Sequence, residues 1–123
     1  MKSKATSSRI NLVKKLARDP QSFSDLRMAL KILGDKWSVL ILIYLTGGPA
    51  RFKDIESVLE DITPRTLTAK LKSLEQAGLI TKKAFQEFPP RTEYRCTKKT
   101  EQLKPTMIEL SRWARKYCKT TIK

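Results

Sequence analysis

ITPRTLTAKLKSLEQAG, from Ile62 to Gly78, carries the clearest structural signal in this chain. Thr63 can cap a helix, because its hydroxyl can accept a hydrogen bond from one of the first backbone amides, which have no partner within the helix. Pro64 fits the first helical position, where no backbone N–H is needed. Gly78 readily takes the left-handed conformation that often ends a helix. The stretch therefore predicts a helix that begins at Pro64 and ends before Gly78.

The two faces of this predicted helix differ in chemistry. Leu67, Leu71 and Leu74 recur at helical spacing and form one apolar stripe. The opposite face combines small side chains, hydroxyls, an amide and cations, and Glu75 is the helix's single acid. Such a surface can approach a polyanion closely and still donate hydrogen bonds. We therefore predict a DNA recognition helix, whose candidate contacts are Thr63, Pro64, Arg65, Thr66, Thr68, Ala69 and Lys72.

Three of these residues have distinct predicted roles. Arg65 can donate two hydrogen bonds to O6 and N7 of guanine, an interaction that discriminates between bases by about 1–3 kcal/mol. Lys72 is expected to contact a phosphate. Thr63 and the backbone amides at the helix start can bind a further phosphate, helped by the helix dipole.

The chain as a whole is strongly basic. It has 26 Lys and Arg residues against 12 Asp and Glu residues, a net charge of +14 at pH 7. An excess of this size favours nucleic acid as the partner, ahead of an anionic membrane surface or a basic surface kept for solubility. The charge is heaviest in residues 1–20 and 98–123 rather than on the predicted recognition helix. It therefore supports affinity for DNA and not sequence preference.

Other features exclude several functions. The 123 residues suffice for one domain with a modest core, and the longest apolar run, Val39 to Leu45, is too short to span a bilayer. Cys96 and Cys118 form neither a metal spacing nor a disulfide framework, and the chain has no histidine. No paired carboxylates or phosphate-binding glycine loop are present either, so we predict no catalytic residue, metal or cofactor. A cytoplasmic, nucleoid-associated protein is expected.

Four helices are predicted before the recognition helix, over residues 8–18, 24–33, 35–45 and about 52–59. The first resembles an organelle transit peptide in composition, but a helix that packs on the core or on a second subunit is favoured. The third is apolar on most faces and is expected to be the most buried. The fourth helix, a short turn and the recognition helix together predict a helix-turn-helix.

After Gly78 the hydrophobic pattern alternates, which predicts two strands over residues 79–85 and 92–97. Residues 86–91 form a stiff turn with a basic tip between them. A hairpin directly after a recognition helix is a wing, which can reach a phosphate or the minor groove. The candidate DNA contacts of the wing are Lys82, Lys83 and Arg91.

Two residues of the wing have alternative roles. An ion pair with Glu87 or Glu93 explains Arg91 nearly as well as a DNA contact does. Cys96 shares a strand face with Tyr94, which favours a buried, small apolar role over a reactive thiol.

A last helix is predicted from Thr97, its candidate cap, to about Cys118. Its apolar residues are spaced alternately by four and three, as in a helix–helix seam. Ile108 and Trp113 lie off the seam, which indicates packing on a second copy as well as on the helix's own domain; packing within the domain alone is the alternative. The predicted dimer interface comprises Leu103, Met107, Leu110, Trp113, Ala114 and Tyr117.

These elements together predict a mainly α fold with a small β-hairpin wing. The architecture is a winged helix-turn-helix domain with additional N- and C-terminal helices for dimerisation. Residues 1–20 are predicted as a basic N-terminal extension with a short helix. Residues 21–123 are predicted as the winged helix domain, including the C-terminal dimerisation helix.

Five segments of the sequence resemble the HxlR-type winged helix-turn-helix family of transcription regulators, which is MarR-like. They are LGDKW (33–37), GPARF (48–52), ITPRTLT (62–68), LEQAGL (74–79) and PPRTEY (89–94). The resemblance implies a homodimer, joined through helices at both ends of the domain, that binds a palindromic operator in double-stranded DNA and switches transcription.

The chain departs from that family in two places. Many members carry a cysteine where this chain has Ser24, and some use it to sense oxidants or electrophiles. Serine forms no thiolate, so sensing through this position is excluded. The basic helix over residues 8–18 is an addition to the family core; it can widen a dimer interface or add phosphate contacts.

The predicted function is a sequence-specific DNA-binding transcription regulator that acts as a homodimer. Two alternatives from other classes are a non-specific basic DNA-coating protein and a winged helix module for protein–protein contact. A small-molecule effector, a redox event at Cys96 or Cys118, and no effector at all are each compatible with the sequence, as are activation and repression.

Overall fold

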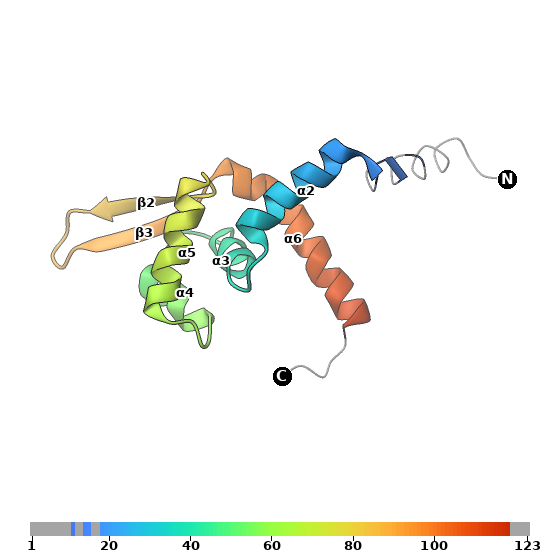
Figure 1. Ribbon diagram of the computed structural model, residues 1–123. Coiled ribbons are helices and arrows are strands. Elements are labelled where there is room, and N and C mark those ends of the chain that lie inside the picture. The colour runs from blue at the N-terminus through green and yellow to red at the C-terminus, as the bar shows by residue number, and fades with distance from the viewer. Residues whose placement is uncertain (1–10, 12–13, 16–17, 119–123) are drawn as a thin grey trace. The chain divides into compact units, whose positions relative to one another are not determined.

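The computed structural model describes residues 11, 14–15 and 18–118 (Figure 1). The chain splits into two compact units, Met1–Gly34 and Asp35–Lys123. The division after residue 20 into a basic extension and a winged helix domain stays a prediction. The helix predicted over residues 8–18 lies largely outside the described residues, and it stays a prediction. Among the described residues, no helix combines the length and the apolar character needed to cross a membrane.

The first unit contains helix α2, Pro20–Leu33. It begins at Pro20 rather than at the predicted Ser24, because Asp19 caps it: the Asp19 carboxylate accepts a hydrogen bond from the Ser22 amide at 2.8 Å. No residue of α2 is buried in the described structure. Its exposed large apolar side chains are Phe23, Leu26, Met28, Leu30 and Ile32.

The second unit contains the six helices and strands predicted for it, in the predicted order, and one further strand. They are α3 (Ser38–Leu45), β1 (Ala50–Arg51), α4 (Phe52–Val58), α5 (Pro64–Gln76), β2 (Ile80–Phe85), β3 (Arg91–Cys96) and α6 (Lys98–Tyr117). The strands form an antiparallel sheet in the order β1-β3-β2. Figure 1 shows the hairpin formed by β2 and β3. The predicted mainly α fold with a β-hairpin wing is therefore confirmed, and β1 is an addition that the sequence analysis missed.

The core of the second unit lies where α3, α4, α5 and the sheet meet. Its fully buried large side chains come from all four: Ile41, Leu42, Leu45, Ile55, Leu67, Leu71, Leu74 and Ile80. Helix α3 begins at Ser38 rather than at the predicted Asp35, because the preceding residues form a turn. The apolar stripe of α5 is thus the surface that fixes this helix to the rest of the unit.

Helix α6 is joined at its first turn to the segment that follows α5. Thr97 was predicted to cap α6 through its hydroxyl, but the hydroxyl instead donates to the Gly78 carbonyl at 2.7 Å. The buried hydroxyl of Thr100 donates to the Leu79 carbonyl. Gly78 has a φ of +78°, the left-handed conformation that glycine tolerates best. These contacts fix the direction in which the chain leaves α5.

Candidate nucleic-acid interface

The start of α5 has the predicted cap. Thr63 has extended backbone angles, and its hydroxyl oxygen accepts a hydrogen bond from the Thr66 amide at 3.1 Å. Pro64 occupies the first helical position. The turn before it includes Asp61, whose φ of +72° lets α4 and α5 follow each other closely. Pro64 and Arg65 at the start of α5 are exposed, and Thr66 is half-buried.

The two faces of α5 are oriented as predicted. Leu67, Leu71 and Leu74 point into the core, with at most 2% of each residue exposed. The other face is open to solvent and contains most of the predicted DNA contacts. Thr66 is half-buried, and the other predicted contacts of this helix are exposed: Thr63, Pro64, Arg65, Thr68, Ala69 and Lys72.

Lys70 differs from its basic neighbours on α5 because it binds another part of the unit. Its Nζ lies 3.5 Å from the Asp35 carboxylate, which also accepts hydrogen bonds from the Trp37 and Ser38 amides at 2.9 and 3.0 Å. Asp35 therefore caps the start of α3 and holds the middle of the recognition helix. This contact joins residues far apart in the chain, so no local sequence pattern predicts it.

The environment of Asp35 favours its charged form. Burial alone raises the pKa of this carboxyl group. The hydrogen bonds from the Ser38 side chain and from the Trp37 and Ser38 amides, together with the charge of Lys70, outweigh burial and lower the pKa below 3.8.

A groove of about 300 Å³ runs between α5 and the sheet. It is lined by Thr68, Leu71, Lys72 and Glu75 from α5 and by Lys82 and Tyr94 from the sheet. Two predicted DNA contacts, Lys72 and Lys82, thus meet across one groove. Burial and then the charge of Glu75 raise the pKa of Tyr94 above 10.0, so its hydroxyl stays protonated and can donate a hydrogen bond.

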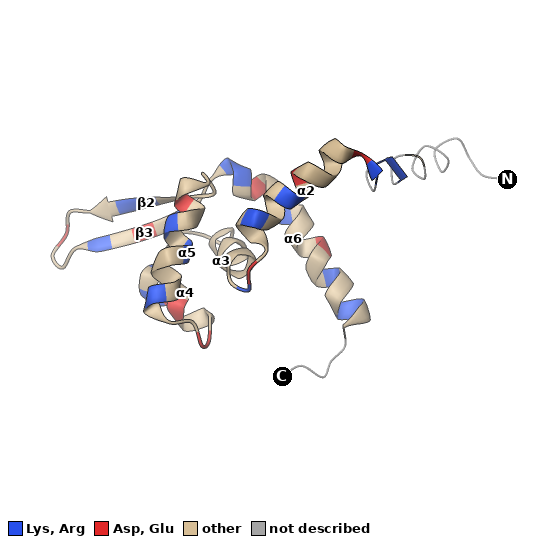
Figure 2. Cartoon of the chain, viewed as in Figure 1, with Lys and Arg blue, Asp and Glu red and all other residues tan. Residues whose placement is uncertain are grey.

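Charged residues occur on both strands of the wing (Figure 2). Arg91 forms both of the ion pairs that the sequence analysis gave as alternatives: its Nη2 lies 3.0 Å from Glu87 Oε1, and its Nη1 lies 3.9 Å from Glu93 Oε2. The guanidinium also lies over the Phe85 ring, 4.1 Å from its centroid. Lys83 lies over the same ring at 5.1 Å. Arg91 therefore has partners within the wing already.

The predicted seam of α6 is divided between the interior and the surface. Met107 is buried at 5% exposure and belongs to the core of its own unit, while Leu103 and Ala114 are half-buried. Leu110, Trp113 and Tyr117 are each more than half exposed. The rings of Trp113 and Tyr117 lie 6.0 Å apart and form one aromatic surface.

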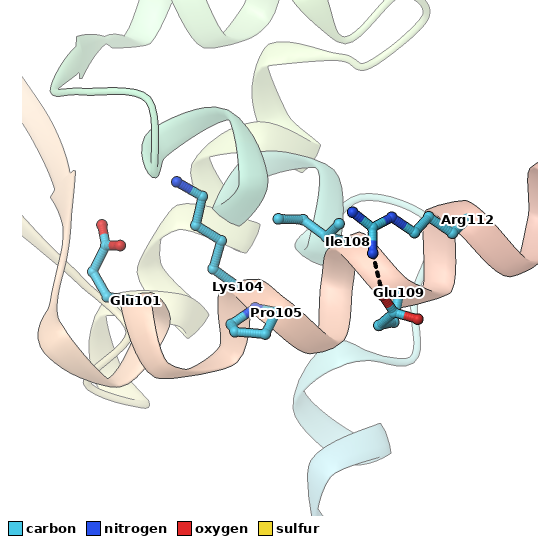
Figure 3. Close-up of a pocket in the computed structure, with 6 residues that line it drawn as sticks. All are labelled: Glu101, Lys104, Pro105, Ile108, Glu109 and Arg112. Carbon is cyan, nitrogen blue, oxygen red and sulfur yellow. Dashed lines mark hydrogen bonds and ion pairs between the residues drawn. The ribbon is translucent and has the colours of Figure 1, made fainter.

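A second hollow, of about 330 Å³, lies on α6 (Figure 3). Its lining residues are Glu101, Lys104, Pro105, Ile108, Glu109 and Arg112, and Arg112 is paired with Glu109 at 2.6 Å. Next to it, Cys96 is half-buried rather than buried, and its thiol donates a hydrogen bond to Glu101 at 3.2 Å. Burial first, and then Glu101, raise the pKa of Cys96 above 9.0, which disfavours the reactive thiolate.

A short helix, a turn, an outward-facing recognition helix and a hairpin directly after it define a winged helix-turn-helix domain. Residues 32–122 match the model of the HxlR-like helix-turn-helix family, and the chain belongs to this family. Since its relatives are transcription regulators, the chain is an HTH-type regulator and not an enzyme.

Individual relatives agree with this assignment. The uncharacterized HTH-type transcriptional regulator YkvN of Bacillus subtilis is 36% identical over 87 residues, which cover 71% of this chain and 74% of YkvN. The redox regulator HypR in its oxidized form is similar in structure, with a TM-score of 0.74 and 25% identity over 78% of this chain and 99% of HypR. The reduced form of YodB from B. subtilis has a TM-score of 0.68 and 31% identity, covering 84% of this chain and 97% of YodB.

Proposed function

We propose that this chain is a sequence-specific DNA-binding regulator that acts as a homodimer on a palindromic operator. The observation that carries the proposal is the capped, solvent-facing start of α5 opposite its buried leucine stripe. In the bound state, Arg65, Thr68 and Ala69 face base edges in the major groove. Lys72 and Lys82 contact phosphates from the two sides of the groove between α5 and the sheet.

The other predicted contacts have supporting roles. Thr63, Pro64 and Thr66 form the helix start, where the helix dipole favours a phosphate. Lys83 adds a cation to the wing strand. Arg91 is proposed to organise the wing rather than to bind DNA directly, because a phosphate contact would require it to leave Glu87 and Glu93. We place the regulator in the cytoplasm, at the nucleoid.

The first test is selection of bound duplexes from a random pool at physiological salt, followed by sequencing. A palindromic motif with two half-sites about one helical turn apart supports the proposal. Tight binding to every duplex, without enrichment, would assign the function to non-specific DNA coating, for which the basic termini suffice. Failure to bind any duplex would assign it to a protein partner.

The roles of Arg65 and Lys72 are separable. We expect Arg65→Ala to reduce the preference for the selected operator by about 1–3 kcal/mol, because a contact to base edges is lost. Lys72→Ala should weaken binding to all duplexes alike. It should also reduce the slope of the logarithm of the binding constant against the logarithm of the salt concentration by about 1, for one lost phosphate contact. Titrations of operator and scrambled duplexes at several salt concentrations measure both effects. Unchanged sequence preference in Arg65→Ala would remove Arg65 from the base-reading residues.

The homodimer is proposed to form through the exposed part of α6, with Leu110, Trp113 and Tyr117 as the apolar contacts and Leu103 and Ala114 at its margin. We expect Trp113→Glu to raise the dimer dissociation constant at least about tenfold, since interface tryptophans often dominate affinity. Sedimentation velocity measures the dissociation constant. Ser111→Glu, on the opposite side of the same helix, is the matched control and should stay dimeric. A dimer of unchanged affinity in Trp113→Glu would exclude this surface.

A further inference from the structure

The tip of the wing has an unusual composition for a surface that would contact only phosphates. Its five residues, 86–90, are all exposed and read Gln-Glu-Phe-Pro-Pro. Phe88 is fully exposed, at 101% of its reference area, and the two prolines follow it directly. Arg91, which makes the predicted turn basic, is the first residue of β3, so the tip itself contains no lysine or arginine. The wing tip therefore exposes three consecutive apolar residues, Phe88, Pro89 and Pro90, on an otherwise basic chain.

The strand ends next to this tip neutralise its remaining charge. Glu87, the tip's single charged residue, is paired with Arg91 at 3.0 Å. Arg91 also lies near Glu93 and over the Phe85 ring, so the two strands are tied together just behind the tip. As a result the exposed Phe88 ring lies at the end of a hairpin that these contacts hold together.

A rigid support favours insertion of this ring into another molecule. Proline fixes the backbone angle φ, so Pro89 and Pro90 leave the tip little freedom to lose on binding. The Phe88 side chain has only two rotatable bonds, and its apolar area is already exposed before binding. An exposed phenylalanine is unfavourable in water, and a partner that covers it recovers that free energy.

We propose that Phe88 is a wedge that enters the minor groove of the bound DNA and partly unstacks one base step. This inference rests on the proposed DNA-binding function and assigns the wing tip a role in it. The hairpin leaves the same sheet that borders the groove of α5, and Lys82 at its foot faces Lys72 across that groove. With α5 in a major groove, the tip reaches the adjacent minor groove, where apolar wedges kink DNA.

A wedge also makes the regulator selective at a position where it forms no hydrogen bond to a base. Pyrimidine–purine steps such as TA and CA unstack most easily, so the energy of deformation depends on the sequence under the tip. The selected operators should therefore be enriched in such a step beside each half-site. In a pool selected with Phe88→Ala, that enrichment should disappear while the half-site recognised by α5 stays the same.

The direct test uses the full chain and selected operator duplexes with 2-aminopurine at the step beside the half-site. Binding of the unaltered protein should raise the fluorescence of this base, because unstacking removes its quenching. Phe88→Ala should bind about tenfold more weakly and leave the fluorescence low, in line with the loss of one aromatic contact to a base. Phe88→Leu keeps an apolar wedge and should retain most of the fluorescence rise. Gln86→Ala, at the same exposed tip, is the matched control and should behave as the unaltered protein.

Each outcome decides the proposal. Phe88 is fully exposed, so its replacement leaves the folded state intact, and circular dichroism checks this. Equal binding and equal fluorescence in Phe88→Ala overturn the wedge while the DNA-binding function stands. The wedge is also overturned if Phe88→Ala binds more weakly but the unaltered protein does not raise the fluorescence of the labelled duplex. It is likewise overturned if Phe88→Ala changes only the self-association of the protein. Failure of the unaltered protein to bind any duplex overturns the wedge and the proposed function together.

Discussion

Leu67→Ala should lower the free energy of unfolding by about 2–5 kcal/mol, because it leaves a cavity beneath the recognition helix. Leu67 is completely buried, and it is the first residue of the stripe that holds α5 against the core. Urea titrations followed by circular dichroism measure the change. They should be run at several protein concentrations, since dissociation of a dimer contributes to the apparent stability.

Lys72→Ala is the matched control for this experiment, because Lys72 lies on the exposed face of the same helix. It should change the free energy of unfolding by no more than about 0.5 kcal/mol and yet weaken DNA binding. The pair of variants would thus separate the structural face of α5 from its binding face. A loss of stability below about 1 kcal/mol in Leu67→Ala would contradict the burial of the stripe.

Asp35→Ala should lower the free energy of unfolding by about 1–3 kcal/mol, because the Trp37 and Ser38 amides lose their charged acceptor and Lys70 loses its partner. Asp35→Asn keeps a side chain that can cap a helix but removes the charge. It should therefore lose less stability than the alanine variant. Equal stability of both variants and the unaltered protein would show that the carboxylate stabilises neither α3 nor α5.

The pH dependence gives a second measure of the same contact. The pKa of Asp35 is lower in the folded chain than the ordinary value of 3.8, so the unfolded chain takes up a proton first as the pH falls. The stabilisation is complete above the unfolded pKa and is lost as the pH falls through the folded pKa. The free energy of unfolding, measured from pH 6 down to below the folded pKa of Asp35, should accordingly fall less steeply in Asp35→Asn than in the unaltered protein, because the asparagine does not titrate.

Local signals allowed the recognition helix to be predicted to within a residue. Thr63, Pro64 and Gly78 each act on their immediate neighbours, so the sequence contains all the information needed for both ends of α5. At Asp19 and Pro20, local signals of the same kind do not distinguish the end of a helix from its start. The pair follows the helix predicted over residues 8–18 and could end it, but the Asp19 side chain caps α2 and Pro20 begins it. An Asp-Pro pair has the chemistry for either position, and only the path of the chain decides between them.

Contacts between distant segments could not be predicted. Strand β1 has two residues, too few for an alternating pattern, and it exists because Ala50 and Arg51 pair with Tyr94 and Glu93. The contact between Lys70 and Asp35 joins two helices through a turn.

The candidate site shows the same division between local pattern and tertiary contact. The exposed face of α5 follows from helical spacing, and so does the general outline of the α6 seam. The burial of Met107 depends on how α6 packs against the core, because the neighbouring seam residue Leu110 stays exposed. Arg91 had two acidic neighbours in the sequence, and the folded hairpin brings both within reach.

The hydrogen bonds of Thr97 to Gly78 and of Thr100 to Leu79 couple α6 to the end of α5, so that a rotation of α6 would also move α5. Helix α6 has 20 residues and is about 30 Å long, and its first turn is anchored at the exit of the recognition helix. In the proposed dimer, a change in the angle at which two α6 helices cross would be passed to both recognition helices as a change in their separation. The operator's half-site spacing is a fixed length, so such a regulator could release DNA without any alteration of the surface that reads it.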